Sequence, residues 1–166
     1  AGGVTFCEGV EVTGIGQKNG RVTGVTTNQG ELESEVVVNC AGMWGREVGL
    51  MAGVAVPLHA CEHFYVVTEP MDGIPPDLPV LRDMDGCAYY KEDAGKILLG
   101  AFEGNARAWG MDGIPKDFSF DELPGDMDHF MPVLEAAMLR VPALETVGLR
   151  KFFCGPESFT PDVRYY

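Results

Sequence analysis

The residues best suited to chemistry lie in the stretch HACEH, residues 59–63. Side chains alternate along a strand, so His59, Cys61 and His63 would share one face. Imidazole and thiolate bind zinc, but a closed site needs a fourth ligand and usually wider ligand spacing. We therefore predict no metal site. We single out His63, because an imidazole titrates near neutrality and can accept or hold a substrate proton. The alternative is a histidine that packs in the core.

A second candidate is the pair Tyr89-Tyr90. Alternation sends the two rings to opposite faces of a sheet. One ring would pack in the core, and the other could place its hydroxyl in a pocket. The sequence alone leaves open which tyrosine does which.

The stretch GIGQKNG, residues 14–20, resembles a dinucleotide-binding fingerprint. The fingerprint requires GxGxxG between a strand and a helix, so that the helix N-terminus meets a pyrophosphate. Here the last spacing is one residue too long, and a strand-like segment follows. We predict a hairpin turn instead.

Composition limits the classes of partner. The chain has 166 residues and a formal net charge of −13, which argues against a nucleic-acid partner. No apolar run reaches the ~18 residues of a membrane span, and the first residues lack the pattern of a signal peptide. The five cysteines have no CxxC spacing, so we expect reduced thiols in an intracellular compartment. Both ends read as those of a segment of a longer protein.

The elements that would position these residues begin with strands predicted over residues 4–15, 21–27 and 31–39. The third runs into VVVNCAGMWG, residues 36–45, in which an apolar run meets glycine. This pattern favours a parallel strand that is buried on both faces. Ligands of α/β folds lie at the carboxyl ends of such strands, where glycine allows close approach. A short helix over residues 44–52 follows.

The second half predicts an α+β arrangement. A strand spans residues 57–69, and a hairpin joins strands at 87–91 and 96–102. Helical spacing covers residues 123–144, with Pro132 opening or kinking the helix. A strand at 147–153 leads into CGPESFTPD, residues 154–162, which we expect to form a rigid loop. The expected domains are residues 1–54, 55–146 and 147–166.

Taken together, these stretches resemble the FAD-dependent amine oxidoreductases related to D-amino-acid oxidase. The likeness is strongest to the dimethylglycine and sarcosine dehydrogenase branch. The stretches that carry it are GRVTGVTT (20–27), VVVNCAGMWG (36–45), PL (57–58) with HFY (63–65), LPVLRD (78–83) with Tyr89-Tyr90, RVP (140–142) and GPESFTPD (155–162). The resemblance implies a fragment of a two-domain flavoprotein. Residues 1–54 and 147–166 would belong to the FAD domain, and residues 55–146 would form a mostly antiparallel sheet with a long helix over the flavin.

The resemblance also implies roles for single residues. Ala41, Gly42 and Trp44 would lie against FAD, and Val12 matches a position whose backbone meets the adenine side. His63 and Tyr89 match catalytic positions beside the substrate amine, with Tyr89 also contacting the cofactor. No metal is implied.

The implied reaction is oxidation of an N-methyl amino acid, dimethylglycine or sarcosine. A hydride passes from the methyl carbon to FAD, and His63 orients the amine and keeps it unprotonated. Electrons would leave to oxygen or to a carrier protein. The compartment would be a bacterial cytoplasm or a mitochondrial matrix. Because the GxGxxG segment would precede residue 1, we expect the isolated chain to be colourless and inactive.

Two alternatives stay open. One is a non-catalytic relative that acts as the regulatory subunit of a pyruvate dehydrogenase phosphatase. The other is a β-rich binding module without flavin.

Overall fold

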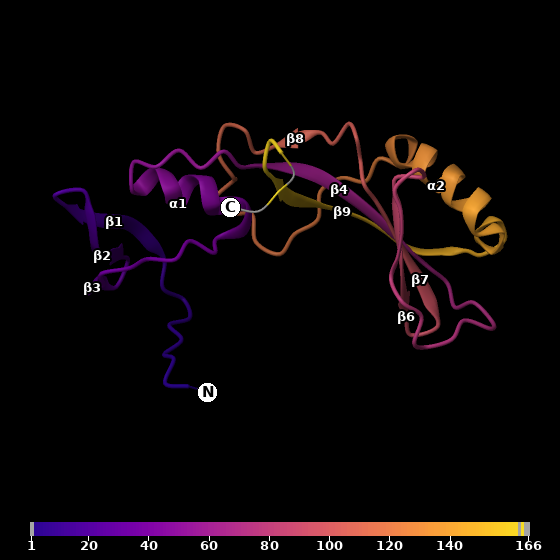
Figure 1. Ribbon diagram of the computed structural model, residues 1–166, viewed down its shortest axis with the longest axis horizontal. Helices are drawn as coiled ribbons and strands as arrows, with labels where there is room; N and C mark the ends of the chain where they lie inside the picture. The colour runs from indigo at the N-terminus through magenta and orange to yellow at the C-terminus, as the bar shows by residue number, and fades with distance from the viewer. Residues whose placement is uncertain (1, 163, 165–166) are drawn as a thin grey trace. The chain divides into compact units, whose positions relative to one another are not determined.

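The computed structural model describes residues 2–162 and residue 164. The chain divides into two compact units, Ala1–His59 with Ser158–Tyr166, and Ala60–Glu157. Both units are built from antiparallel strands and short helices (Figure 1). The α+β fold class is confirmed.

The first unit contains a three-stranded antiparallel meander of β1 (Val12–Lys18), β2 (Arg21–Thr27) and β3 (Gly30–Glu33). Lys18 pairs with Arg21, so only Asn19 and Gly20 form the turn. Their φ angles are 53° and 74°, as a two-residue hairpin turn requires. The GIGQKNG stretch is therefore a hairpin, as predicted. The first strand was predicted over residues 4–15. It spans Val12–Lys18 and is therefore shorter than predicted.

The predicted parallel strand is wrong for the described residues. The third strand ends at Glu33, and residues 36–40 have no strand partner among the described residues. Val36 and Val38 are 71% and 77% exposed. A parallel strand exists only where a neighbouring strand supplies its hydrogen bonds, and no described strand does so here.

A helix follows this segment nearly as predicted. The 3-10 turn η1 (Gly42–Trp44) leads directly into α1 (Gly45–Met51). The Gln17 side chain donates a hydrogen bond to the Ala52 carbonyl at 2.7 Å. This bond ties the end of α1 to strand β1.

The second unit is organised by a six-stranded sheet. Its order is β5-β6-β7-β4-β8, and β9 also pairs with β4. The strands are β4 (His59–Thr68), β5 (Leu81–Asp83), β6 (Ala88–Asp93), β7 (Lys96–Ala101), β8 (Ala108–Trp109) and β9 (Leu149–Phe159). The hairpin of β6 and β7 confirms the prediction, with a two-residue turn at Ala94 and Gly95.

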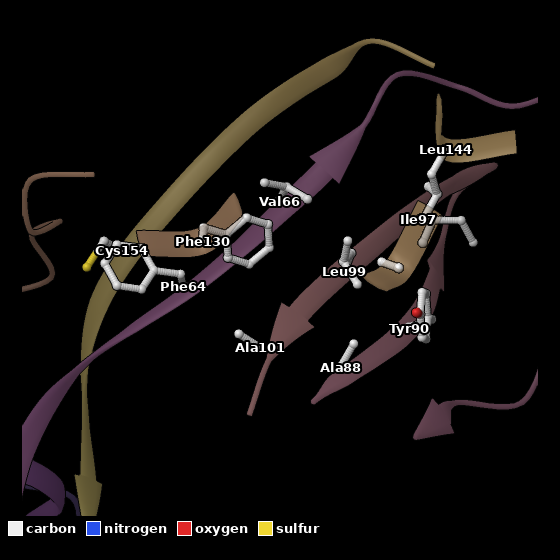
Figure 2. Close-up of a cluster of buried hydrophobic side chains, with 11 residues drawn as sticks. Phe64, Val66, Ala88, Tyr90, Ile97, Leu99, Ala101, Phe130, Leu144 and Cys154 are labelled. Atoms are coloured by element: carbon white, nitrogen blue, oxygen red, sulfur yellow. The ribbon is translucent and has the colours of Figure 1, made fainter. Parts of the chain in front are cut away.

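One face of this sheet forms the hydrophobic core (Figure 2). Phe64 and Val66 from β4, Leu99 from β7 and Phe130 from α2 (Met127–Arg140) are fully buried in it. Phe64 and Val66 are two residues apart, so strand alternation sends both side chains to the same side. The intervening residues of β4 therefore face the opposite side of the sheet.

Helix α2 is fixed at both ends. The Asp126 side chain caps its start by accepting the His129 N–H at 2.9 Å. Near its end, the Arg140 Nε donates to Asp83 Oδ2 of β5 at 2.8 Å. Arg140 lowers the pKa of the Asp83 carboxyl, because the hydrogen bond favours the charged form. Pro132 lies inside the helix and does not open it.

The C-terminal segment corrects a second expectation. Residues 154–162 were expected to form a rigid loop, yet β9 continues to Phe159 through Pro156 and pairs with β4. Proline lacks a ladder donor and is tolerated at sheet edges. Edge pairing with β4 therefore overrides the turn-like composition.

We expect Phe130→Ala to lower the free energy of unfolding by about 3–5 kcal/mol, because it leaves a cavity in the core. Phe130 is fully buried. Leu139→Ala on the same helix is the matched control, since Leu139 is 84% exposed and such a change stays within about 0.5 kcal/mol. Urea unfolding of both variants measures the difference. Equal losses would contradict the assignment of the core.

Candidate active site

The face of the sheet opposite the core carries the candidate chemistry. Phe64 lies in the core, so its neighbour His63 projects to the other side. Tyr90 is likewise a core residue, which sends Tyr89 to the same side as His63. The question left open by the sequence is thereby answered: Tyr90 packs, and Tyr89 faces outward with the histidine.

Tyr89 is positioned by a glycine on the neighbouring strand. Tyr89 of β6 pairs directly with Gly100 of β7, and its ring lies over that glycine. A Cβ atom at Gly100 would overlap the Tyr89 ring. The absence of a side chain there lets the tyrosine lie across the sheet towards His63. Their rings are nearly parallel, with centroids 6.2 Å apart, and His63 Nε2 lies 3.2 Å from the Tyr89 hydroxyl.

A buried glutamate holds the other side of the imidazole. Glu103 Oε2 lies 3.2 Å from His63 Nδ1, and Glu103 Oε1 accepts the Phe64 N–H at 3.0 Å. Its side chain is only 4% exposed. Sequence analysis missed Glu103. The signal was an acid placed directly after the apolar run ILLGAF of residues 97–102, where a charge needs a partner.

A second carboxylate approaches the same nitrogen. Glu157 Oε2, from β9, lies 3.3 Å from His63 Nδ1, and its side chain is 54% exposed. Glu157 belongs to the GPESFTPD stretch, which carries part of the family resemblance but in which the sequence analysis assigned no site residue. Because this segment is a strand, the glutamate reaches the imidazole from β9.

These contacts favour one tautomer of the neutral ring. Carboxylates accept hydrogen bonds, so Nδ1 carries a proton, and Nε2 of the neutral ring accepts from the Tyr89 hydroxyl. Burial lowers the pKa of His63, but the hydrogen bond to Glu103 and the charges of Glu157 and Glu103 outweigh it, so that pKa is raised. Burial, with the same two carboxylates, also raises the pKa of Tyr89. Tyr89 is therefore a neutral phenol at physiological pH.

Four of the five predicted cofactor contacts lie in the first unit. Val12 begins β1, and Ala41, Gly42 and Trp44 occupy one turn. Asn39 shapes this turn, because its Nδ2 donates to the Gly45 carbonyl at 2.8 Å and its Oδ1 accepts the Ala41 N–H at 3.2 Å. His63 and Tyr89 belong to the second unit. The roles of all six residues stay predictions.

This turn is compatible with a flat cofactor. Gly42 has a φ of 53°, and no atom lies within 4 Å of where its Cβ would be. The Trp44 ring is exposed beside it. Open backbone next to an exposed aromatic ring leaves room for a ring system to approach closely.

The cysteines and acids give no metal site in the described part of the chain. There, no group of three or more His, Cys, Asp or Glu side chains could hold a metal ion. Cys61 and Cys154 are buried free thiols. Burial is the main cause that raises the pKa of Cys154 to about 12, so this thiol is not a nucleophile at neutral pH. Among the described helices, none has the length and apolar character to cross a bilayer.

Comparison with known proteins gives a consistent result. The family described as "FAD dependent oxidoreductase" matches residues 1–164. The chain is 41% identical over 167 residues to mouse sarcosine dehydrogenase, covering 98% of this chain and 18% of the relative. It is 40% identical over 165 residues to the mouse regulatory subunit of pyruvate dehydrogenase phosphatase, covering 98% and 19%. It is 38% identical to a 4-methylaminobutanoate oxidase of Paenarthrobacter nicotinovorans, covering 98% and 20%.

Solved structures show the same fold. The L-proline dehydrogenase of P. horikoshii superposes with a TM-score of 0.71 at 24% identity, covering 92% of this chain and 38% of that one. The glycine oxidase of Geobacillus kaustophilus gives a TM-score of 0.66 at 21% identity, covering 95% and 38%. Among the sequence relatives named in the preceding paragraph, the chain spans about a fifth of their length.

Proposed function

This chain belongs to the FAD-dependent oxidoreductase family, and from that premise we propose that the protein containing it oxidises an N-methyl amino acid such as sarcosine or dimethylglycine. The observation that carries the proposal is the pairing of His63 with Tyr89 at 3.2 Å, backed by the buried Glu103. The resemblance to sarcosine and dimethylglycine dehydrogenases supports the choice of substrate.

The charges of the site suit an amine. Glu103 and Glu157 place negative charge beside His63, and this attracts a substrate that arrives as an ammonium ion. The Tyr89 oxygen can accept a hydrogen bond from that ammonium while its own proton points to His63 Nε2. The imidazole, with its raised pKa, can then hold a proton that the amine gives up. The amine is left with the free lone pair that oxidation at the adjacent carbon requires.

FAD is the cofactor of this family, and when bound it would accept the hydride of the methyl carbon. We assign Val12, Ala41, Gly42 and Trp44 to holding it, with Tyr89 contacting it from the substrate side. The contribution of the remaining residues is to orient the amine and control its protonation.

The test is anaerobic flavin reduction by the full-length, FAD-loaded protein. We expect sarcosine or dimethylglycine to bleach the flavin absorbance, and glycine, which has no N-methyl group, to leave it unchanged. 4-Methylaminobutanoate belongs in the same series, since a relative is named for it. A flavin that none of these amines reduces would contradict the proposal.

One alternative has a specific observation in its favour. The regulatory subunit of mouse pyruvate dehydrogenase phosphatase matches 98% of this chain at 40% identity. A protein of that kind would bind a phosphatase and would leave its flavin oxidised with every amine above. The presence of His63, Tyr89 and Glu103 in hydrogen-bond contact favours the enzyme.

The electron acceptor and the compartment follow from the same proposal. Reduced flavin would pass electrons to oxygen or to a carrier protein. The relatives include mitochondrial proteins of mouse and a protein of a bacterium, so we assign the protein to the mitochondrial matrix or a bacterial cytoplasm.

A further inference from the structure

His63 has more carboxylates beside its Nδ1 atom than its orientation requires. Its Nδ1 atom is hydrogen-bonded to Glu103 Oε2 at 3.2 Å and lies in ion-pair contact with Glu157 Oε2 at 3.3 Å. One carboxylate is enough to fix the tautomer and the direction of an imidazole ring. The second carboxylate therefore calls for a different explanation.

The two glutamates differ in how firmly they are held. Glu103 is almost completely buried, and its second oxygen is engaged by the Phe64 N–H. Glu157 is half-exposed, and among the described residues its side chain forms an ion pair with His63 and no hydrogen bond. Glu103 thus has the properties of a fixed anchor, whereas Glu157 can turn between the imidazole and water.

A line of close polar contacts runs through the ring. The Tyr89 hydroxyl lies 3.2 Å from Nε2, and Glu157 lies beside Nδ1 on the far side of the same ring. The His63 side chain itself is only 17% exposed, so its direct exchange with water is restricted. Glu157 is the group in this line that reaches solvent.

We propose that Tyr89, His63 and Glu157 form a proton exit route, in which Glu157 delivers the proton of the substrate ammonium to water. This inference rests on the proposed function. The titratable groups that face His63 are Tyr89 from β6, Glu103 following β7 and Glu157 from β9. Only Glu157 among them is both adjacent to Nδ1 and open to solvent.

The route balances in protons and electrons. The N–H bond of the ammonium breaks, and its electron pair stays on the amine nitrogen. The Tyr89 oxygen takes this proton as its own proton passes to His63 Nε2. The Nδ1 proton of the resulting imidazolium leaves its hydrogen bond with Glu103 and passes to the Glu157 carboxylate 3.3 Å away, which releases it to water. After the product has left, Nε2 gives its proton to water and Nδ1 takes one up through Glu157. These two transfers cancel, so the net change is one proton moved from substrate to solvent.

The test compares Glu157→Gln with wild type in the full-length, FAD-loaded protein. Rapid mixing with sarcosine or dimethylglycine follows flavin absorbance and, with a pH-indicator dye, proton release. In dilute buffer we expect both signals to slow by about 10-fold, less than the about 10²–10⁴-fold of a lost general base, because the ring keeps a slow exchange with water. Added buffer base should restore both rates, since a small base can take the place of an exposed carboxylate.

The matched control is Glu69→Gln, another half-exposed glutamate of the same unit, which pairs with Arg150 at 3.7 Å. It should behave as wild type at every buffer concentration. Wild-type rates for Glu157→Gln in dilute buffer would overturn the exit route, as would a slow rate that added base leaves unchanged. If no amine reduces the wild-type flavin, the proposed function fails first and the exit route falls with it.

Discussion

His63→Gln is expected to slow flavin reduction by N-methyl amines by about 10²–10⁴-fold in the full-length protein. Glutamine can still form a hydrogen bond with the Tyr89 hydroxyl, but its amide cannot take up a proton. The change therefore removes proton acceptance while it keeps the size and polarity of the side chain. Rapid-mixing measurement of flavin absorbance at saturating substrate gives the rate directly.

His129→Gln is the matched control for this variant. His129 lies on α2 and packs against the Phe64 ring, with centroids 5.3 Å apart, on the core side of the sheet. We expect its rate to equal that of wild type. Equal rates for wild type and His63→Gln would remove His63 from the reaction, whatever its contacts.

The same variant should change how stability depends on pH. The carboxylates raise the pKa of His63 above its ordinary value of 6.5, so the folded chain binds this proton more tightly than the unfolded chain. The added stability is fully present below pH 6.5 and is lost as the pH rises through the folded pKa. Urea midpoints of His63→Gln should lack this loss, and a slope equal to that of wild type would contradict the raised pKa.

The sequence alone predicted the elements whose structure depends on a few neighbouring residues, such as two-residue hairpin turns. The turns at Asn19-Gly20 and Ala94-Gly95 each join strands through two residues of positive φ, and a two-residue turn fixes the register of both strands by itself. For the same reason β2 begins and ends at the predicted residues. Alternation predicted that neighbouring residues of β4 face opposite sides, and the burial of Phe64 and Val66 shows which side is the core.

Long-range pairing decided the remaining features. Residues 36–40 have the composition of a buried strand, but no described strand pairs with them. Residues 154–159 have the composition of a loop, but pairing with β4 makes them a strand. The composition of a segment shows whether it can form a strand, but it forms one only where a neighbouring strand pairs with it.

The candidate site also combines residues that the sequence suggested with a residue that only the fold reveals. His63 and Tyr89 stood out by residue type, but Glu103 is a single acid with no motif around it. Its bond to His63 joins residues 40 apart in the sequence. Such a partner becomes visible only when the sheet brings β4 next to β7, where Tyr65 pairs with Gly100.

Gly100→Ala is expected to slow flavin reduction by about 10²-fold with little effect on folding. The new Cβ would overlap the Tyr89 ring, and the ring must turn away because the backbone of β7 is held by strands on both sides. The hydroxyl then leaves its position 3.2 Å from His63 Nε2. Displacement of a positioned group by about 1 Å costs on this order.

Gly104→Ala tests whether the slower flavin reduction arises from the overlap with Tyr89 or from any glycine-to-alanine change nearby. Gly104 lies four residues further along, and no atom lies within 4 Å of where its Cβ would be. The variant should reduce flavin at the wild-type rate.

Tyr89→Phe supplies the second comparison, because it removes the hydroxyl without moving the ring. If Gly100→Ala acts by displacing that hydroxyl, combining the two changes should slow the reaction no further than the slower single variant. Additive losses would show that Gly100 acts on the reaction through another group, and the glycine would then have no special relation to Tyr89.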